Sequence, residues 1–238
     1  ENPFLSIEFL TNVHLQYSGL RAEQELGGAF TNIEGSEWPA EFFHGILFDD
    51  WPPDINLKVL ALDPSKGKAD KSGDYSAFVL LGLDNDWRLW VDADLSNTRT
   101  VEADPGLPSL VEDGLAHCLS FSPHAFVVEA NGFQELVAAA IRRIATERRL
   151  HVPLQVAVST TPKQARIRTI GTYLAQKRLR IRNTPGGRLL VQQLRDFPLA
   201  EHDDGPDALA LAVRMADRLV AKDRGKPGAE QPQPYRGW

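Results

Sequence analysis

The sequence predicts an α/β fold in which a mixed β-sheet carries helices on both of its faces. Three short apolar runs follow one another over 57–63, 75–83 and 87–95, and only "DND" separates the last two. Short runs with tight connections are typical of an antiparallel meander. From residue 107 onward, helical and strand-like patterns alternate, which indicates parallel strands joined by helical crossovers.

The later elements follow from their own patterns. Short, mostly apolar runs predict three more strands. Apolar residues at helical spacing predict five helices. The strands are "AFVVEAN" (125–131), "LQVAV" (154–158) and "LRIR" (179–182), and the helices cover 107–121, 133–149, 163–178, 188–197 and about 205–220. The intervening "NTPGG" (183–187) is expected to be a turn that forms a flap beside a site.

Together these elements define one arrangement of the sheet. Strand-helix-strand units close as right-handed crossovers, so parallel strands should join the meander in one mixed sheet. This is the ribonuclease H-like arrangement. Other α/β sheets fit the pattern of elements alone equally well.

The composition excludes several classes of protein. No apolar run approaches the roughly 20 residues that span a bilayer, and 42% hydrophobic content is ordinary for a soluble globular chain. Cys118 is the only cysteine, which excludes an intrachain disulfide and a thiolate zinc site. We therefore expect a soluble protein from a reducing compartment.

Acidic residues stand at the ends of two predicted strands and just before the last helix. Asp63 ends "LKVLALD", and Glu129 follows the apolar run "AFVV". The carboxyl ends of neighbouring parallel strands open onto one crevice, so these two carboxylates should converge. The stretch "HDDGPD" adds Asp203, Asp204 and Asp207. Such an all-oxygen set suits Mg²⁺ or Mn²⁺, and two ions about 4 Å apart would support phosphodiester hydrolysis.

Each acid also has a purely structural interpretation. Asp63 can start the turn that follows it, and Glu129 can belong to a buried ion pair. Asp204 is placed to cap the last helix, where Asp207 would complement the helix dipole. Asp203 can be a solvated neighbour. Capping does not prevent metal binding, so these alternatives stay open.

Four stretches in order suggest a specific relationship. They are "LALDPSKGKADKSGDYSA", "VVEANGFQ", "TTPKQARIRTI" and "LLVQQLRDFPLAEHDDGPDALALA". With these stretches, over about 57–220, the chain resembles the C-terminal nuclease domain of the large terminase subunit of tailed bacteriophages, whose fold is ribonuclease H-like. The resemblance implies an Asp, Glu, Asp metal site made by Asp63, Glu129 and either Asp204 or Asp203.

The segment "DGPDALA" is also similar to the closing motif of Holliday-junction resolvases, which implies roles for both Asp204 and Asp207. The sequence does not rank Asp203 against Asp204. Two further residues are secondary candidates. Asp74 lies in a predicted loop, where aspartate is usually solvated, and a lone histidine in a turn, such as His202, is usually incidental.

The resemblance implies a Mg²⁺- or Mn²⁺-dependent endonuclease that cuts concatemeric viral DNA during packaging, in the cytoplasm of the bacterial host. Its partners would be double-stranded DNA, the terminase ATPase domain, the small terminase subunit and the portal. The sequence contains no G-x-x-x-x-G-K-[ST] phosphate loop, so no ATP site is expected. We therefore expect an N-terminal extension or linker from a missing ATPase domain (1–55), the nuclease domain (56–222) and a flexible tail (223–238).

Two other functions fit the same residues. A resolvase- or transposase-like nuclease would share the carboxylates but prefer branched DNA or DNA ends. A non-catalytic domain that docks on DNA or portal would use the same acids only as helix caps and in salt bridges.

Basic residues gather in one part of an otherwise acidic chain. The net charge is −6, yet residues 140–190 contain twelve Lys or Arg and only one acid, Glu147. Contacts from Lys and Arg to phosphates would hold a DNA backbone. The expected DNA-binding residues are Lys163, Arg166, Arg168, Arg180, Arg182 and Arg188. Arg142, Arg143, Arg148 and Arg149 are instead expected on the solvated face of a helix.

Overall fold

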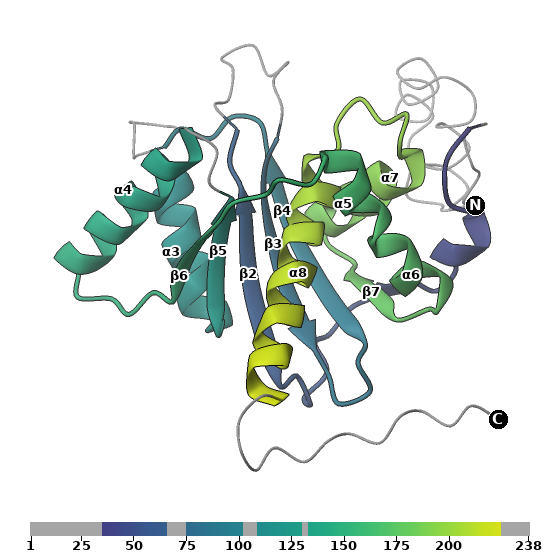
Figure 1. The fold of residues 1–238 in the computed structure, drawn as a ribbon, viewed down its shortest axis with the longest axis horizontal. Helices are drawn as coiled ribbons and strands as arrows, with labels where there is room; N and C mark the ends of the chain where they lie inside the picture. The colour runs from purple at the N-terminus through teal and green to yellow at the C-terminus, as the bar shows by residue number, and fades with distance from the viewer. Residues whose placement is uncertain (1–34, 66–74, 102–108, 130–132, 225–238) are drawn as a thin grey trace, which may run out of the picture.

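The computed structural model describes residues 35–65, 75–101, 109–129 and 133–224. Their centre is a seven-stranded sheet with the order β1-β7-β4-β3-β2-β5-β6 (Figure 1). Strands β2 (Leu57–Asp63), β3 (Ser76–Leu83) and β4 (Leu89–Ser96) form the predicted antiparallel meander. Asp84 organises the β3–β4 turn, because its carboxylate accepts hydrogen bonds from two backbone amides and from the Trp90 indole.

Parallel strands extend the meander on both sides. Next to β2 lie β5 (Ala125–Glu129) and then β6 (Leu154–Ala157). On the other side, β7 (Leu179–Arg182) pairs with β4, and the two-residue strand β1 (Leu47–Phe48) pairs with β7. The predicted mixed sheet is therefore confirmed. The sequence pattern did not predict β1, which is too short to show a periodicity.

Helices cover both faces of the sheet, as predicted (Figure 1). Helices α3 (Leu110–Phe121) and α4 (Phe133–Glu147) pack on one face. The other face carries α5 (Lys163–Arg168), α6 (Ile170–Ala175), α7 (Pro185–Asp196) and α8 (Asp204–Arg224), together with the 3-10 helix η1 (Ala40–Phe43). No helix among the described residues combines the length and apolarity that a bilayer span requires.

Alternation along the central strands determines which face each side chain meets. In β2, Leu60 and Leu62 pack with α3 and α4, whereas Val59 and Ala61 belong to the core beneath α8. The period of two therefore places Asp63 on the α8 face. The same alternation in β5 places Glu129 there as well, because Val127 belongs to the core beneath α8.

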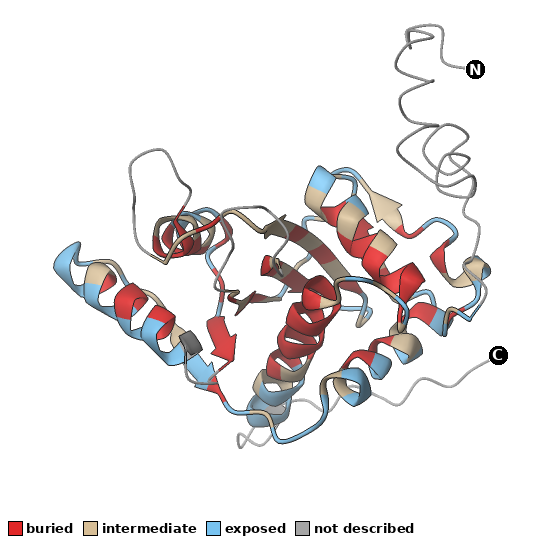
Figure 2. Cartoon of the chain, turned by 90° about the horizontal axis from the view of Figure 1, so that it is seen from above, coloured by how far each residue is buried: buried red, intermediate tan, exposed pale blue. Residues whose placement is uncertain are grey.

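Helix α8 crosses the centre of this face. Its first three turns are almost entirely buried (Figure 2). The alanines of "DALALA" let the helix lie close to β2 and β3. Its start is fixed from α7, since the Gln193 side chain accepts a hydrogen bond of 3.0 Å from the Gly205 amide.

Two of the predicted helical regions differ from the structure by more than a few terminal residues. The helix expected over 163–178 is divided at Thr169 into α5 and α6. The turn expected over 183–187 is largely the first turn of α7, which begins at Pro185, and the Thr184 hydroxyl caps it by accepting from the Gly187 amide. Proline is well suited to a first helical turn. Gly186 is required because a Cβ there would overlap the Ala93 carbonyl oxygen.

Candidate carboxylate site

Two acids stand at the carboxyl ends of neighbouring parallel strands, where these strands end at the same side of the sheet. Leu62 of β2 is in register with Val128 of β5, so Asp63 and Glu129 occupy the next position on each strand. Both side chains face α8. Glu129 is only 5% exposed, and one of its carboxylate oxygens, Oε1, is buried without a hydrogen-bond donor.

The start of α8 brings the remaining predicted acids to this edge. Asp204 and Asp207 are buried in the first turn of α8, and Asp203 precedes it. The Tyr75 amide, just before β3, donates a 2.9 Å hydrogen bond to Asp204 Oδ2. We call Asp63, Glu129, Asp203, Asp204 and Asp207 the carboxylate cluster.

Two members of the carboxylate cluster have raised pKa values, because they are buried close to other acids. Burial, and then the charges of Asp207, Asp204 and Glu129, raise the pKa of Asp63 well above its ordinary value, although Lys163 opposes them. Burial also raises the pKa of Glu129, against the opposing charge of Arg166. Ionising the whole cluster is thus unfavourable unless positive charge lies among its members.

Two cations from α5 supply positive charge. Lys163 Nζ lies 2.6 Å from Asp203 Oδ1, 3.4 Å from Asp204 Oδ1 and 4.0 Å from Asp207 Oδ2. Arg166 donates to both oxygens of Asp207, at 3.0 and 2.5 Å, and lies 3.3 Å from Glu129 Oε1. Burial lowers the pKa of Lys163, but the hydrogen bond to Asp203 and the charge of Asp204 outweigh it and raise the pKa.

The chemistry of the cluster suits a divalent cation, but its present geometry is that of an ion-pair network. Carboxylate oxygens are the ligands that Mg²⁺ and Mn²⁺ prefer, and Glu129 Oε1 accepts no hydrogen bond, although the Arg166 guanidinium lies 3.3 Å from it. Within the described ranges, however, no three acidic, histidine or cysteine side chains are arranged to hold a metal ion. Lys163 and Arg166 lie between the acids instead. The Lys163 side chain is about a third exposed, whereas that of Arg166 is largely buried.

The structure thus gathers most of the predicted site residues and separates others from them. His202 lies at the margin, where its ring meets the Tyr75 ring edge-on at 5.0 Å. Asp74 lies outside the described residues. Arg168 pairs with Glu37 on the surface, at 2.9 Å.

The other predicted DNA-binding residues lie on β7 and α7. Arg182 lies 3.3 Å from Asp92, and Arg180 and Arg188 also lie on these elements. Their role, like that of the carboxylate cluster, stays a prediction.

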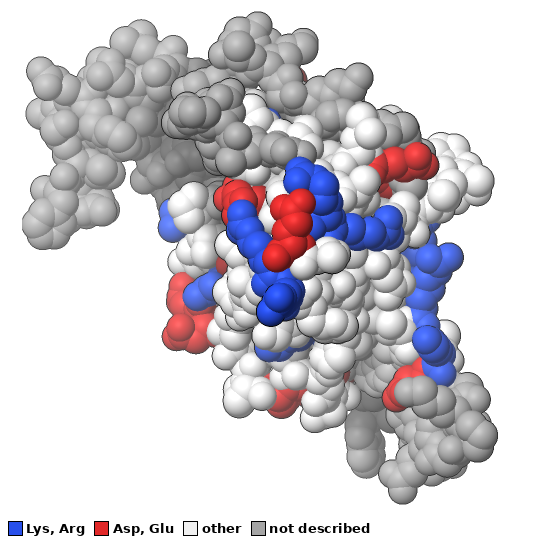
Figure 3. Space-filling view, turned by 90° about the vertical axis from the view of Figure 1, so that its left-hand side faces the viewer, with Lys and Arg blue, Asp and Glu red and all other residues white. Residues whose placement is uncertain are grey.

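The four arginines expected on a solvated face are exposed, on α4 and in the turn that follows it. Figure 3 shows acidic side chains among the basic ones on this side of the molecule. Arg148 forms hydrogen bonds to both carboxylate oxygens of Glu112, and Arg143 pairs with Glu147. This side therefore does not present uniform positive charge.

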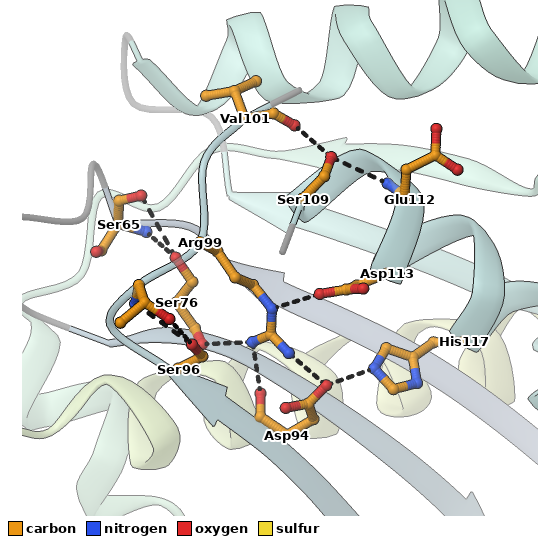
Figure 4. A network of polar contacts seen from close by, with 11 residues as sticks. Ser65, Ser76, Asp94, Ser96, Arg99, Val101, Ser109, Glu112, Asp113 and His117 are labelled. Carbon is orange, nitrogen blue, oxygen red and sulfur yellow. Dashed lines mark hydrogen bonds and ion pairs between the residues drawn. The ribbon is translucent and has the colours of Figure 1, made fainter. Parts of the chain in front are cut away.

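A second polar network, which the sequence analysis missed, lies at the same edge but on the α3 face (Figure 4). The buried Arg99 guanidinium lies 2.5 Å from Asp94 and 2.7 Å from Asp113, and His117 contacts Asp94 at 2.8 Å. Arg99 also donates to the Ser76 carbonyl, at 3.4 Å. Asp113 and His117 are four residues apart and therefore lie on one side of α3, and this spacing could have indicated the network from the sequence.

Three solved structures are similar to this chain, and the first of them shows the fold. The HK97 bacteriophage large terminase matches with a TM-score of 0.50 and 13% identity, over 73% of this chain and 42% of that one. The large terminase of a thermophilic bacteriophage matches with a TM-score of 0.49 and 13% identity, over 92% and 52%. The fowlpox virus Holliday junction resolvase gives 0.44 and 9%, over 68% and 99%.

The predicted ribonuclease H-like fold, similar to that of a large terminase, is confirmed. The chain spans about half the length of the terminase chains it matches. No protein-family model matches the sequence, and no curated protein matches it significantly.

Proposed function

We propose that this chain is a divalent-metal-dependent DNA endonuclease that hydrolyses phosphodiester bonds at the carboxylate cluster. The observation that carries the proposal is the convergence of Asp63, Glu129 and Asp204 from three elements at one edge of the sheet. Packing of the apolar core alone does not require these three acids to lie together. Three buried or half-buried acids at one place oppose folding unless a cation compensates them.

In this proposal Asp63, Glu129 and Asp204 or Asp203 hold Mg²⁺ or Mn²⁺. Bound in pairs, such ions activate a water and stabilise the leaving oxygen. Asp207 lies beside these ligands and keeps Arg166 oriented through two hydrogen bonds. Metal binding would displace Lys163 from Asp203 and Asp204 and Arg166 from Glu129. The Lys163 ammonium, and the Arg166 guanidinium still held by Asp207, would then be suitable donors to the substrate phosphate.

The biological setting that we propose is cleavage of concatemeric viral DNA during genome packaging. The four sequence stretches and the terminase-like fold support it. The partners would be double-stranded DNA, an ATPase domain, the small terminase subunit and the portal, in the cytoplasm of a bacterial host. A resolvase-like preference for branched DNA is the second candidate, supported by the paired acids of "DGPDALA", which are both buried here.

Plasmid cleavage by the purified chain tests the proposal. Wild-type protein, Asp63→Asn and Glu129→Gln are compared in EDTA, Mg²⁺ and Mn²⁺, with Asp86→Asn as the matched control, since Asp86 is exposed in the β3–β4 turn. We expect metal-dependent nicking and linearisation, lost in both site variants and kept in the control. Equal cleavage by all four proteins would overturn the site. Faster cleavage of a four-way junction than of duplex would favour the resolvase-like alternative.

A further inference from the structure

A pocket of about 500 Å³ adjoins the carboxylate cluster on the α8 face. Thr169, between α5 and α6, and Tyr173 of α6 line one wall, and Ala210 and Arg214 of α8 line the other. Figure 1 shows these helices side by side. Arg166 lines the pocket and also contacts Glu129, so this one side chain lies between the pocket and the cluster.

Arg214 is the cationic residue that α8 contributes to the lining of this pocket. It follows Asp207 by seven residues, which is two helical turns and places both on one side of the helix, about 10 Å apart along its axis. The Arg214 side chain is half-buried, and its Nη1 donates a 3.2 Å hydrogen bond to Ser159 Oγ.

The charge of Arg214 is less compensated than that of its neighbours. Lys163 and Arg166 each contact two or more acids, whereas in the described part of the chain no carboxylate lies within ion-pair distance of Arg214. Burial lowers the pKa of Arg214, as do the charges of Arg218 and Arg166, although Glu129 opposes them. Arginine nevertheless stays protonated in proteins, so the pocket retains positive charge that an anion can compensate.

We propose that this pocket is a subsite for a backbone phosphate of the nucleic acid, bound by the Arg214 guanidinium. The proposal rests on the proposed nuclease function. A guanidinium fork matches phosphate oxygens, and the hydroxyls of Thr161 and Thr172, which also line the pocket, are further donors.

An acidic residue at the end of the pocket away from the cluster limits where an anion can bind. Asp217 lies three residues beyond Arg214 on α8 and lines the pocket there. Its charge repels a phosphate. The anion therefore belongs at the end of the pocket nearer the cluster, between Arg214 and Arg166.

Salt-dependent DNA binding tests this subsite without relying on catalysis. The full chain is titrated with a fluorescent DNA duplex in EDTA over a series of salt concentrations. The variants are Arg214→Gln and Arg214→Lys. The matched control is Arg218→Gln, which removes the same charge from the same helix at an exposed residue outside the pocket. Thermal unfolding shows whether each variant is folded.

We expect Arg214→Gln to weaken binding roughly tenfold and to reduce the slope of log K against log salt by about 0.9, the loss of one phosphate contact. Arg214→Lys should keep the slope and lose roughly threefold in affinity, since an ammonium lacks the fork. Arg218→Gln should keep the wild-type slope.

An unchanged slope in folded Arg214→Gln, an equal decrease in Arg218→Gln, or no DNA binding by the wild type would each overturn the subsite. A different result would refute the proposed nuclease function. A wild-type chain that shows these slopes but cuts no plasmid with Mg²⁺ or Mn²⁺ leaves the subsite standing and refutes the nuclease.

Discussion

Arg166 holds Asp207 in a two-pronged contact, with its Nε 3.0 Å from Oδ1 and its Nη2 2.5 Å from Oδ2. The pair joins α5 to the first turn of α8, although the two residues are 41 positions apart. Both side chains are largely buried. The contact therefore fixes the helix that carries Asp204 and Asp207 against the helix that carries Lys163.

Removing Arg166 should destabilise the metal-free protein. Arg166→Gln removes the cation nearest to both Asp207 and Glu129 and leaves Lys163, 4.0 Å from Asp207, as the nearest remaining one. The loss should cost about 3 kcal/mol in the free energy of unfolding. Denaturant unfolding in EDTA measures this loss. Arg168→Gln, which removes an exposed pair with Glu37, should cost less than about 1 kcal/mol. Equal losses in the two variants would contradict a buried, compensating role for Arg166.

The carboxylate cluster should make the stability of the metal-free protein depend on pH. Burial, and then the charge of Asp207, raise the pKa of Asp63, so the folded chain binds this proton more tightly than the unfolded chain does. The contribution of Asp63 is therefore present at low pH and is lost as pH rises from about 4 through the raised pKa.

Comparison of the wild type with Asp63→Asn in EDTA isolates this effect. The variant cannot ionise at residue 63, so its free energy of unfolding should fall less steeply between about pH 4 and about pH 8. It should equal or exceed the wild type in stability at the upper end. Parallel curves for the two proteins would show that Asp63 is not electrostatically strained.

The network on the α3 face should have the opposite dependence on pH. Burial opposes ionisation of Asp94, but hydrogen bonds from His117 and Arg99 lower its pKa to about 2. Its contribution is therefore present above the ordinary carboxylate pKa of about 4 and is lost as pH falls toward about 2. Asp94→Asn should cost roughly 1–3 kcal/mol at neutral pH. Its stability should also decrease less than that of the wild type across that acid range, as followed by urea unfolding.

The sheet and the cluster were predictable because their signals are local. Each strand is a short apolar run, and Asp63 and Glu129 end two of them, so strand alternation and parallel pairing placed both acids. The short strand β1 and the early start of α7 depend on tertiary contacts instead. Gly186, for example, lies at the first turn of α7 because the Ala93 carbonyl leaves no room for a side chain.

The sequence patterns also did not predict the ion pairs. Lys163 and Arg166 were predicted as DNA-binding residues, whereas in this structure they contact the acids of the cluster. Such pairs join residues about 40 positions apart in sequence, and no periodicity specifies them. The same holds for Arg99, which meets Asp94 and Asp113 only after β4 and α3 have packed.

Packing at the start of α7 gives a prediction that concerns the fold alone. Gly186→Ala should force α7 away from β4 and destabilise the protein by about 3 kcal/mol or more. Pro185→Ala, at the neighbouring exposed position, should cost less than about 1 kcal/mol. Thermal unfolding of both variants measures the difference. A stable Gly186→Ala protein would indicate that α7 starts elsewhere.

Binding of metal should be visible without any nuclease activity. A cation that binds the folded chain stabilises it by about 2.7 kcal/mol when its concentration is about 100 times the dissociation constant. Mn²⁺ should therefore raise the unfolding midpoint of the wild type. It should have little effect on Asp63→Asn or Glu129→Gln, which lack a predicted ligand. Asp86→Asn, altered in an exposed turn, should respond like the wild type.

Since metal must displace Lys163 from the acids, Lys163→Gln should bind Mn²⁺ more tightly than the wild type. Equal shifts in all five proteins would place the ion elsewhere and remove the metal from the proposed mechanism.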